Sequence, residues 1–121
     1  MSESAEGAPV ESSALIDLVI DAWKFARLFN RVVSKLDSNE QARYLNQVRF
    51  FERRVEQAAD SVGAKLVSIE GLPFESGLAA TPLNLDEFSE NDILFVDHML
   101  EPIVMGSNGV LRFGTLMLRK L

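Results

Sequence analysis

The chain has 121 residues, of which 47% are hydrophobic and 25% are charged, a balance typical of one folded domain. Its 18 acidic and 12 basic residues give a net charge of -6, which argues against nucleic acid binding, because that affinity depends mainly on neutralising phosphates. Cysteine is absent, which excludes disulfides and thiolate metal sites.

The N-terminal part of the sequence predicts a tail followed by a long helix. Residues 1–12 carry small and acidic residues without a hydrophobic period, and we expect a disordered acidic tail. The helix should begin near Ser12 or Ser13, since either serine can cap it. Its apolar residues recur at spacings of four and three, as in a heptad seam that a partner helix covers. The residues of this seam are Leu15, Val19, Ala22, Ala26, Phe29, Val33 and Leu36.

A second apolar seam runs beside the first one on the same helix. Its residues are Leu18, Ala22, Phe25, Phe29, Val32 and Leu36. Two adjoining seams make the apolar surface wider than a single partner helix can cover. The first helix is therefore expected to contact at least two neighbouring helices.

A second helix is predicted after the interruption at Asp37-Ser38-Asn39. Ser38 followed by Gln41 fits a capping box, and Gly63 fits a left-handed stop at the other end of the helix. The connection between the helices is short, so residues 13–62 should form an antiparallel hairpin. The buried face of the second helix is expected to carry Tyr44, Leu45, Val48, Phe51, Val55, Ala58 or Ala59, and Val62.

The two broad apolar faces of this hairpin predict association of two copies. One hairpin cannot bury both faces internally, and full burial of a Phe or Leu contributes about 1.5–3 kcal/mol. We expect a homodimer in which the two hairpins form a four-helix bundle. Phe50 projects away from the buried face of its helix, and either contact with another protomer or simple exposure accounts for it. Phe50 and Phe51 therefore join the first seam as expected dimerisation residues.

From residue 63 to residue 121 the hydrophobic period changes, and we expect a β domain. Lys65–Glu70 reads as a short strand that ends at Gly71-Leu72-Pro73. Asn108-Gly109 favours a tight hairpin turn. Further strands are expected at residues 83–85, 93–96, 103–105 and 110–118. The predicted fold class is α+β, a helical hairpin followed by a small, mainly antiparallel sheet of about four to six strands.

Two stretches of this sequence, Gly63 to Glu75 and Val110 to Leu118, together resemble the C-terminal part of GrpE-type nucleotide exchange factors. In that family a helix ends in Gly and a short strand leads to a Phe-containing turn. The chain then closes with a Gly-rich hairpin, Leu-Arg and an apolar strand. The helical hairpin is also similar to the short helices that pair as a four-helix bundle in the family, so the resemblance covers roughly residues 14–121.

The resemblance implies a homodimeric co-chaperone. Its β domain would dock on the nucleotide-binding domain of a DnaK-type chaperone and promote ADP release, without binding nucleotide itself. The implied partner-binding residues are Arg112, Leu111, Gly109 and Phe74. Arg112 could bind a partner carboxylate or anchor the sheet by pairing with Asp97 or Glu101, and Phe74 also fits the core of the β domain.

An alternative is a dimeric scaffold or adaptor protein that has the GrpE fold but no exchange activity. Pro102-Ile103 stands where the family has Gly-Tyr near the hairpin. About a dozen residues precede the first helix, where the family has a long coiled coil. Both departures favour this alternative.

The sequence offers little from which to build a reaction centre. It has one histidine, His98, no cysteine, no phosphate-binding glycine loop and no carboxylate pair on a common face. We therefore expect no enzymatic activity, no cofactor and no metal site. No apolar run approaches the roughly 20 residues that span a bilayer, and the acidic N-terminus lacks the basic region of a signal peptide. We expect a cytoplasmic protein that binds neither nucleic acid nor membranes.

Overall fold

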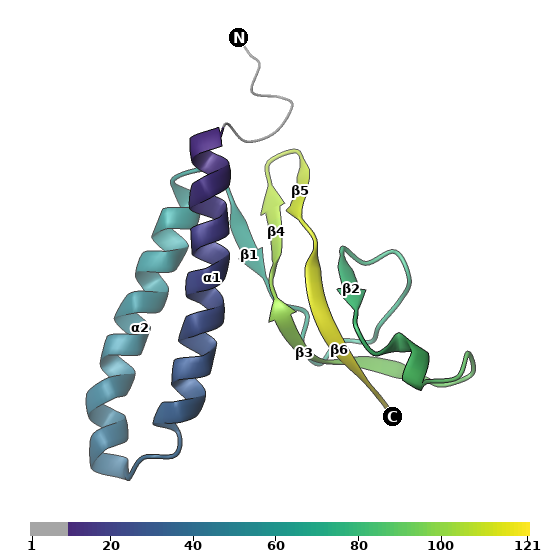
Figure 1. Cartoon of the computed structure of the whole chain (residues 1–121), viewed down its shortest axis with the longest axis horizontal. Coiled ribbons are helices and arrows are strands. Elements are labelled where there is room, and N and C mark those ends of the chain that lie inside the picture. Colours follow the sequence, from purple (N-terminus) through teal and green to yellow (C-terminus); the bar gives the residue numbers. More distant parts are fainter. Residues whose placement is uncertain (1–9) are drawn as a thin grey trace. The chain divides into compact units, whose positions relative to one another are not determined.

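The computed structural model describes residues 10–121, which form a helical unit up to Ala64 and a β unit from Lys65 to Leu121 (Figure 1). The helical unit contains α1 (Val10–Val33) and α2 (Ser38–Asp60), and the β unit contains strands β1 to β6 and a short 3-10 helix. The α+β class and the order of its elements are as predicted. Residues 1–9 of the expected tail lie outside the described residues, whereas residues 10–12 belong to α1, so the tail prediction was wrong there.

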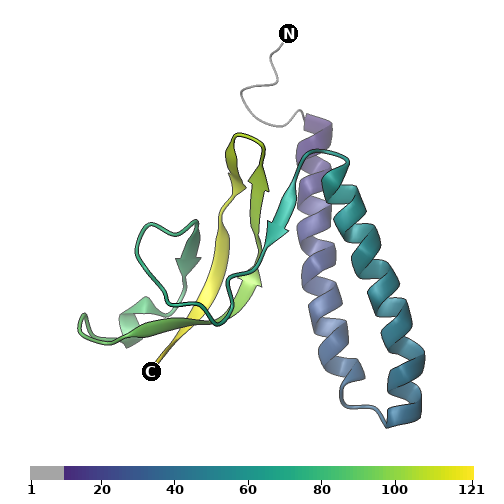
Figure 2. The ribbon, with the colours of Figure 1, turned by 180° about the vertical axis from the view of Figure 1, so that it is seen from behind.

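Helix α1 begins earlier than expected and packs along α2 (Figure 2). Ser12 and Ser13 lie inside its first turns, so neither is the cap. A serine in the first turns of a helix lowers the stability of the helix only a little. A residue that prefers the cap position therefore does not have to occupy it. The buried side chains of α1 are Ile16, Val19, Ile20, Ala26 and Val33.

The start of α2 is capped by Asp37, whose carboxylate accepts the backbone N–H of Glu40 at 3.1 Å. The predicted capping box of Ser38 and Gln41 was therefore wrong. Aspartate caps a helix as well as serine does, and Asp37 stands one residue earlier. The Gln41 amide instead donates to the carbonyls of Ser34 (3.1 Å) and Leu36 (2.7 Å), which ties the connection to the end of α1.

Gly63 ends the second helix as predicted. Its φ is +71°, a left-handed conformation that glycine adopts without a steric cost. The N–H of Ala64 donates to the carbonyl of Ala59 at 2.9 Å, and the N–H of Gly63 donates to that of Asp60 at 3.0 Å. This pair of bonds is the Schellman pattern of a helix C-terminus. Between the helices, the Asn30 amide donates to the Glu52 carboxylate at 3.1 Å.

The β unit is built on one long hairpin. Its strands are β3 (Leu94–Glu101), β4 (Ile103–Gly106), β5 (Gly109–Arg112) and β6 (Gly114–Lys120). Glu101 lies opposite Thr115 in the β3–β6 pair, and Val104 lies opposite Arg112 in the β4–β5 pair. The same register therefore continues across the break at Pro102 and Phe113. The predicted tight turn consists of Ser107 and Asn108, and Gly109 follows it with a φ of +132°.

Two short strands flank this hairpin on opposite sides (Figure 1). β1 (Lys65–Val67) pairs antiparallel with β4, and β2 (Ala80–Pro82) pairs parallel with β6. Two three-stranded sheets result, β1-β4-β5 and β2-β6-β3, rather than the single sheet expected. The predicted strand at residues 83–85 was wrong, since Leu85–Glu87 forms the 3-10 helix η2. The predicted strand at 110–118 is divided at Phe113.

The outer edge of β3 is covered by the segment that follows β1. The predicted strand over residues 65–70 ends at Val67, and the chain then runs along β3 through separate hydrogen bonds. Gly71 donates to the carbonyl of Val96, whose own N–H donates to the carbonyl of Leu72, both at 2.9 Å. The Glu70 carboxylate accepts the N–H of Met99 at 2.7 Å. A side chain thus completes the pairing of a strand that is irregular at this point.

Gly114 marks the closest approach of the two strands at the break. A Cβ atom at this position would lie 2.7 Å from the Glu101 carbonyl oxygen and 3.1 Å from the Ile103 nitrogen. Both are backbone atoms, so we expect Gly114→Ala to destabilise the β unit by about 1–3 kcal/mol. Amide hydrogen exchange of β6 measures the loss. Gly106→Ala is the control, because the three atoms nearest to its Cβ would all belong to the Leu111 side chain rather than to backbone; equal losses in both variants would contradict this account.

Candidate functional site

The first candidate site is an apolar surface of the helical hairpin. On α1, Val19, Ala26 and Val33 are buried, and the residue before each of them is exposed. At about 100° per residue, these neighbours lie on one flank of the buried stripe. They are Leu18, Phe25 and Val32, exposed by 63%, 59% and 50%. The residues that the two seams share, Ala22, Phe29 and Leu36, are half-buried between them.

Helix α2 contributes to the same surface. Phe51 and Ala58 stand four residues before and three residues after the buried Val55, just as Ala22 and Phe29 stand around Ala26. On each helix, the pair is therefore rotated in the same direction about the helix axis, relative to the buried residue. Because the two helices run antiparallel, both pairs face the same side of the hairpin. The rings of Phe25 and Phe29 stack with their centroids 6.1 Å apart. The resulting apolar face consists of Leu18, Ala22, Phe25, Phe29 and Val32 of α1 and Tyr44, Phe51 and Ala58 of α2.

The structure divides the expected dimerisation residues into two groups. Val19, Ala26 and Val33 are buried within the chain, and Leu15 is half-buried beside them. Phe51 belongs to the exposed apolar face. Phe50 stands two residues after the buried Val48 and therefore lies on the side of α2 that faces away from α1. The Arg54 guanidinium lies over its ring, 5.7 Å from the ring centroid. Val19, Ala26 and Val33 of the first seam thus pack inside one hairpin, whereas Leu18, Phe25 and Val32 of the second seam remain exposed.

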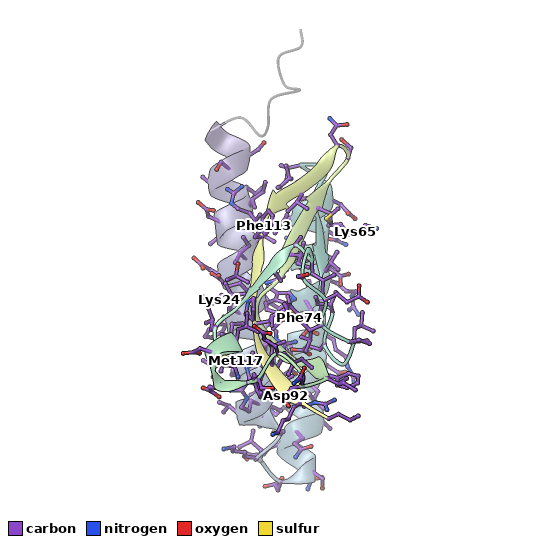
Figure 3. All side chains as sticks on the ribbon, turned by 90° about the vertical axis from the view of Figure 1, so that its right-hand side faces the viewer. Lys24, Lys65, Phe74, Asp92, Phe113 and Met117 are labelled. Carbon is purple, nitrogen blue, oxygen red and sulfur yellow. The ribbon has the colours of Figure 1, made fainter. Side chains whose placement is uncertain are left out.

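The second candidate site is the end of the β unit near the turn between β4 and β5. Gly109 is exposed there, and Leu111 and Arg112 are half-buried on β5. Phe74 is not part of this group. Its N–H donates to the carbonyl of Leu94 at 2.9 Å, at the opposite end of the long hairpin from the turn. Figure 3 shows Phe74 and Phe113 at different levels of the β unit.

Arg112 donates from Nη1 to the carbonyl of Leu111 at 3.2 Å. Asp97, one of its two expected partners within the sheet, forms its ion pair with Arg119 at 3.8 Å. The other, Glu101, accepts a hydrogen bond from the Thr115 hydroxyl at 3.2 Å, and both Glu101 and Arg112 take part in further interactions within the chain. Both charges of the Arg119 pair are about half exposed, so that pair contributes little to stability.

Two residues were missed by sequence reasoning. Asn84 is buried, and its amide exchanges two hydrogen bonds with the backbone of Leu118; an asparagine in an expected loop carries no signal for such a role. Phe113 is 65% exposed at a break, whereas the sequence placed it inside the predicted strand at residues 110–118. Its neighbour Gly114 was the available signal, because a glycine inside a strand often marks a break.

The described residues contain no group of three or more His, Cys, Asp or Glu side chains that could hold a metal ion. Neither α1 nor α2, the long helices within residues 10–121, is long and apolar enough to cross a membrane. No family model, characterised protein or solved structure matches this chain.

Proposed function

We propose that this chain is a GrpE-like co-chaperone that works as a homodimer in the cytoplasm. In this proposal it binds the nucleotide-binding domain of a DnaK-type chaperone and promotes the release of ADP. The observation that carries the proposal is the apolar face, which stays exposed after α1 and α2 have packed together. A dimer surface of this kind, combined with the order of a helical hairpin and a β unit, is what the resemblance to exchange factors implies.

The apolar face supports pairing of two hairpins as a four-helix bundle. Exposed contiguous apolar surface marks an interaction site, and this face includes Phe25 and Phe51, which are 59% and 42% exposed. Full burial of one such side chain contributes about 1.5–3 kcal/mol. Because a two-fold axis brings the same surface of both copies together, each such residue is buried twice in the dimer.

The β unit suits the role of the docking module. It has its own core, formed by side chains of β3, β4 and β6. The residues of that core include Val96, Met99, Val104, Leu116 and Leu118. Nucleotide exchange of this kind requires no bond chemistry. A protein that binds the open state of the chaperone more tightly than the closed state shifts the equilibrium between the two states by the difference in affinity. About 1.4 kcal/mol of preference accelerates release tenfold, if the open state is the one that releases ADP.

The proposal is tested by following release of a fluorescent ADP analogue from a DnaK-type chaperone of the same cell. We expect micromolar dimer to accelerate release at least about tenfold. Arg112→Glu should remove at least about tenfold of this effect, because a bidentate contact with a carboxylate becomes a repulsion. Lys120→Glu makes the same change of charge at an exposed position at the end of β6 and should leave release unaffected. Absence of acceleration by the unaltered dimer would contradict exchange activity.

The second candidate function is that of a dimeric scaffold or adaptor with the same fold but without exchange activity. It is favoured by Pro102, which is buried at the break of the long hairpin and stands where the resemblance leads one to expect glycine. This candidate predicts a stable dimer that leaves ADP release unchanged and instead binds another protein. Abolition of that binding by Arg112→Glu would support it.

A further inference from the structure

The turn between β4 and β5 lies at an exposed end of the β unit (Figure 1). Ser107, Asn108 and Gly109 are all exposed there. Within residues 10–121, no hydrogen bond or ion pair holds the side chain of Asn108. Asn108 is also the one asparagine of the chain that a glycine follows. Its side-chain amide can therefore rotate toward the backbone nitrogen of the next residue.

Gly109 leaves this backbone nitrogen uncrowded. Glycine has no Cβ atom, and apart from its chain neighbours no atom of the described residues lies within 4 Å of the point where a Cβ would stand. A side chain at this point would hinder the nitrogen as it approaches the amide carbon of Asn108. The nitrogen is therefore accessible both to the asparagine side chain and to water.

The backbone of the turn is held only weakly. Neither Ser107 nor Asn108 has a positive φ, so the turn belongs to neither of the two types whose twist matches that of the flanking strands. Gly106 and Gly109 form the last pair of the β4–β5 ladder, and the register already shifts beyond Met105. The end of such a short ladder opens at a small cost in free energy. Each opening lets Asn108 reach the conformation in which its side chain can close a ring.

We propose that Asn108 is a modification site, at which the folded chain deamidates without an enzyme. The Gly109 nitrogen forms a bond to Cγ of Asn108, and the bond from Cγ to Nδ2 breaks. Nδ2 leaves as ammonia and takes the proton of the Gly109 N–H. Water then opens the cyclic imide: attack at Cγ gives aspartate, and attack at the main-chain carbonyl carbon gives isoaspartate. Neither step oxidises or reduces the chain.

Both products change the turn. Each adds a negative charge to a chain that is already acidic, and isoaspartate also inserts the Cβ atom into the main chain. The longer main chain disturbs the pairing of Gly106 with Gly109, so the end of the β4–β5 ladder should loosen. The inference is independent of the proposed function, because it concerns the chemistry of the β unit alone.

Other asparagines of the same chain serve as internal controls. Asn39 and Asn46 are exposed on α2, and Asn91 is exposed in the β unit. Each of them precedes a residue with a long or charged side chain. Asn84 is buried, and two hydrogen bonds hold its amide. If exposure alone decided the reaction, the first three would deamidate as readily as Asn108.

The experiment keeps the unaltered full-length chain for several weeks at physiological temperature. Peptide mapping by mass spectrometry then separates asparagine, aspartate and isoaspartate at each position. We expect Asn108 to react at least about tenfold faster than Asn46 or Asn91. Asn108→Gln should stay intact at this position, because the longer side chain would have to close a larger ring. Amide exchange of Val110 should be faster in the aged chain than in an equally aged Asn108→Gln variant.

The same incubation in guanidinium chloride shows how fast Asn108 reacts when the chain is unfolded. In the folded chain Asn108 should react within about tenfold of that rate. A larger protection would overturn the inference, because the turn would then hold the asparagine away from the Gly109 nitrogen. A rate at Asn108 no higher than the rate at Asn91 would overturn it as well. Unchanged exchange of Val110 after conversion would contradict the loosening of the ladder.

Discussion

Phe25→Asp is expected to separate the proposed dimer into folded monomers. Phe25 lies in the middle of the apolar face and is 59% exposed in the single chain, so the substitution disturbs little within one hairpin. In the dimer it removes two buried rings and places two carboxylates in an apolar interface, where unpaired charges are costly. We expect the dissociation constant of the dimer to rise at least about a hundredfold. Sedimentation velocity across a concentration series measures this change.

A matched control is Asn46→Asp, which adds the same charge to an exposed position of α2 outside the apolar face. It should leave the dimer intact, and both variants should keep the helical circular dichroism signal. A dimer that tolerates Phe25→Asp would show that the apolar face is not the contact between copies. An unaltered chain that sediments as a folded monomer at micromolar concentration would remove the four-helix bundle altogether.

The second large effect is expected for Asn84→Ala in the β unit. The Asn84 amide donates to the Leu118 carbonyl at 3.0 Å and accepts the Leu118 N–H at 2.9 Å, in a position that is only 7% exposed. Asn84 thereby extends the pairing of β2 with β6 beyond Leu83, whose N–H donates to the carbonyl of Leu116. Alanine leaves two buried backbone groups without partners, at about 1–3 kcal/mol each. We expect a loss of about 2–6 kcal/mol in the stability of the β unit.

The measurement has to report on the β unit alone. Trp23 and Tyr44, the single Trp and the single Tyr of the chain, both belong to the helical unit, so their fluorescence follows the hairpin instead. Amide hydrogen exchange of β6, with Leu118 as the main reporter, follows the β unit directly. Asn91→Ala, an exposed asparagine of the same unit, should change exchange little. Unchanged protection of Leu118 in Asn84→Ala would show that its two hydrogen bonds contribute nothing.

The helical unit illustrates how far periodicity can be used as a guide to structure. The spacing of apolar residues predicted α1, and the helix carries both seams as far as Val33, whereas Leu36, the last residue of each predicted seam, lies beyond its end. Periodicity could not decide which seam faces α2, because both satisfy the same spacing of four and three. The packing of α2 against Val19, Ala26 and Val33 made that choice, and it left Phe25 exposed. Likewise, Asp37 and Ser38 are equally good caps, and only the structure shows that Asp37 is used.

The sequence alone determined the features that depend on near neighbours. These are the two helices, the stop at Gly63 and the tight turn before Gly109, where local backbone preferences and spacing decide the conformation. The tertiary structure decided the pairing of β2 with β6, the break at Phe113 and the role of Asn84. Each of these depends on a hydrogen-bond partner or a close contact distant in the sequence, as Asn84 and Leu118 are, 34 residues apart. Such partners have no local pattern, so only the folded chain reveals them.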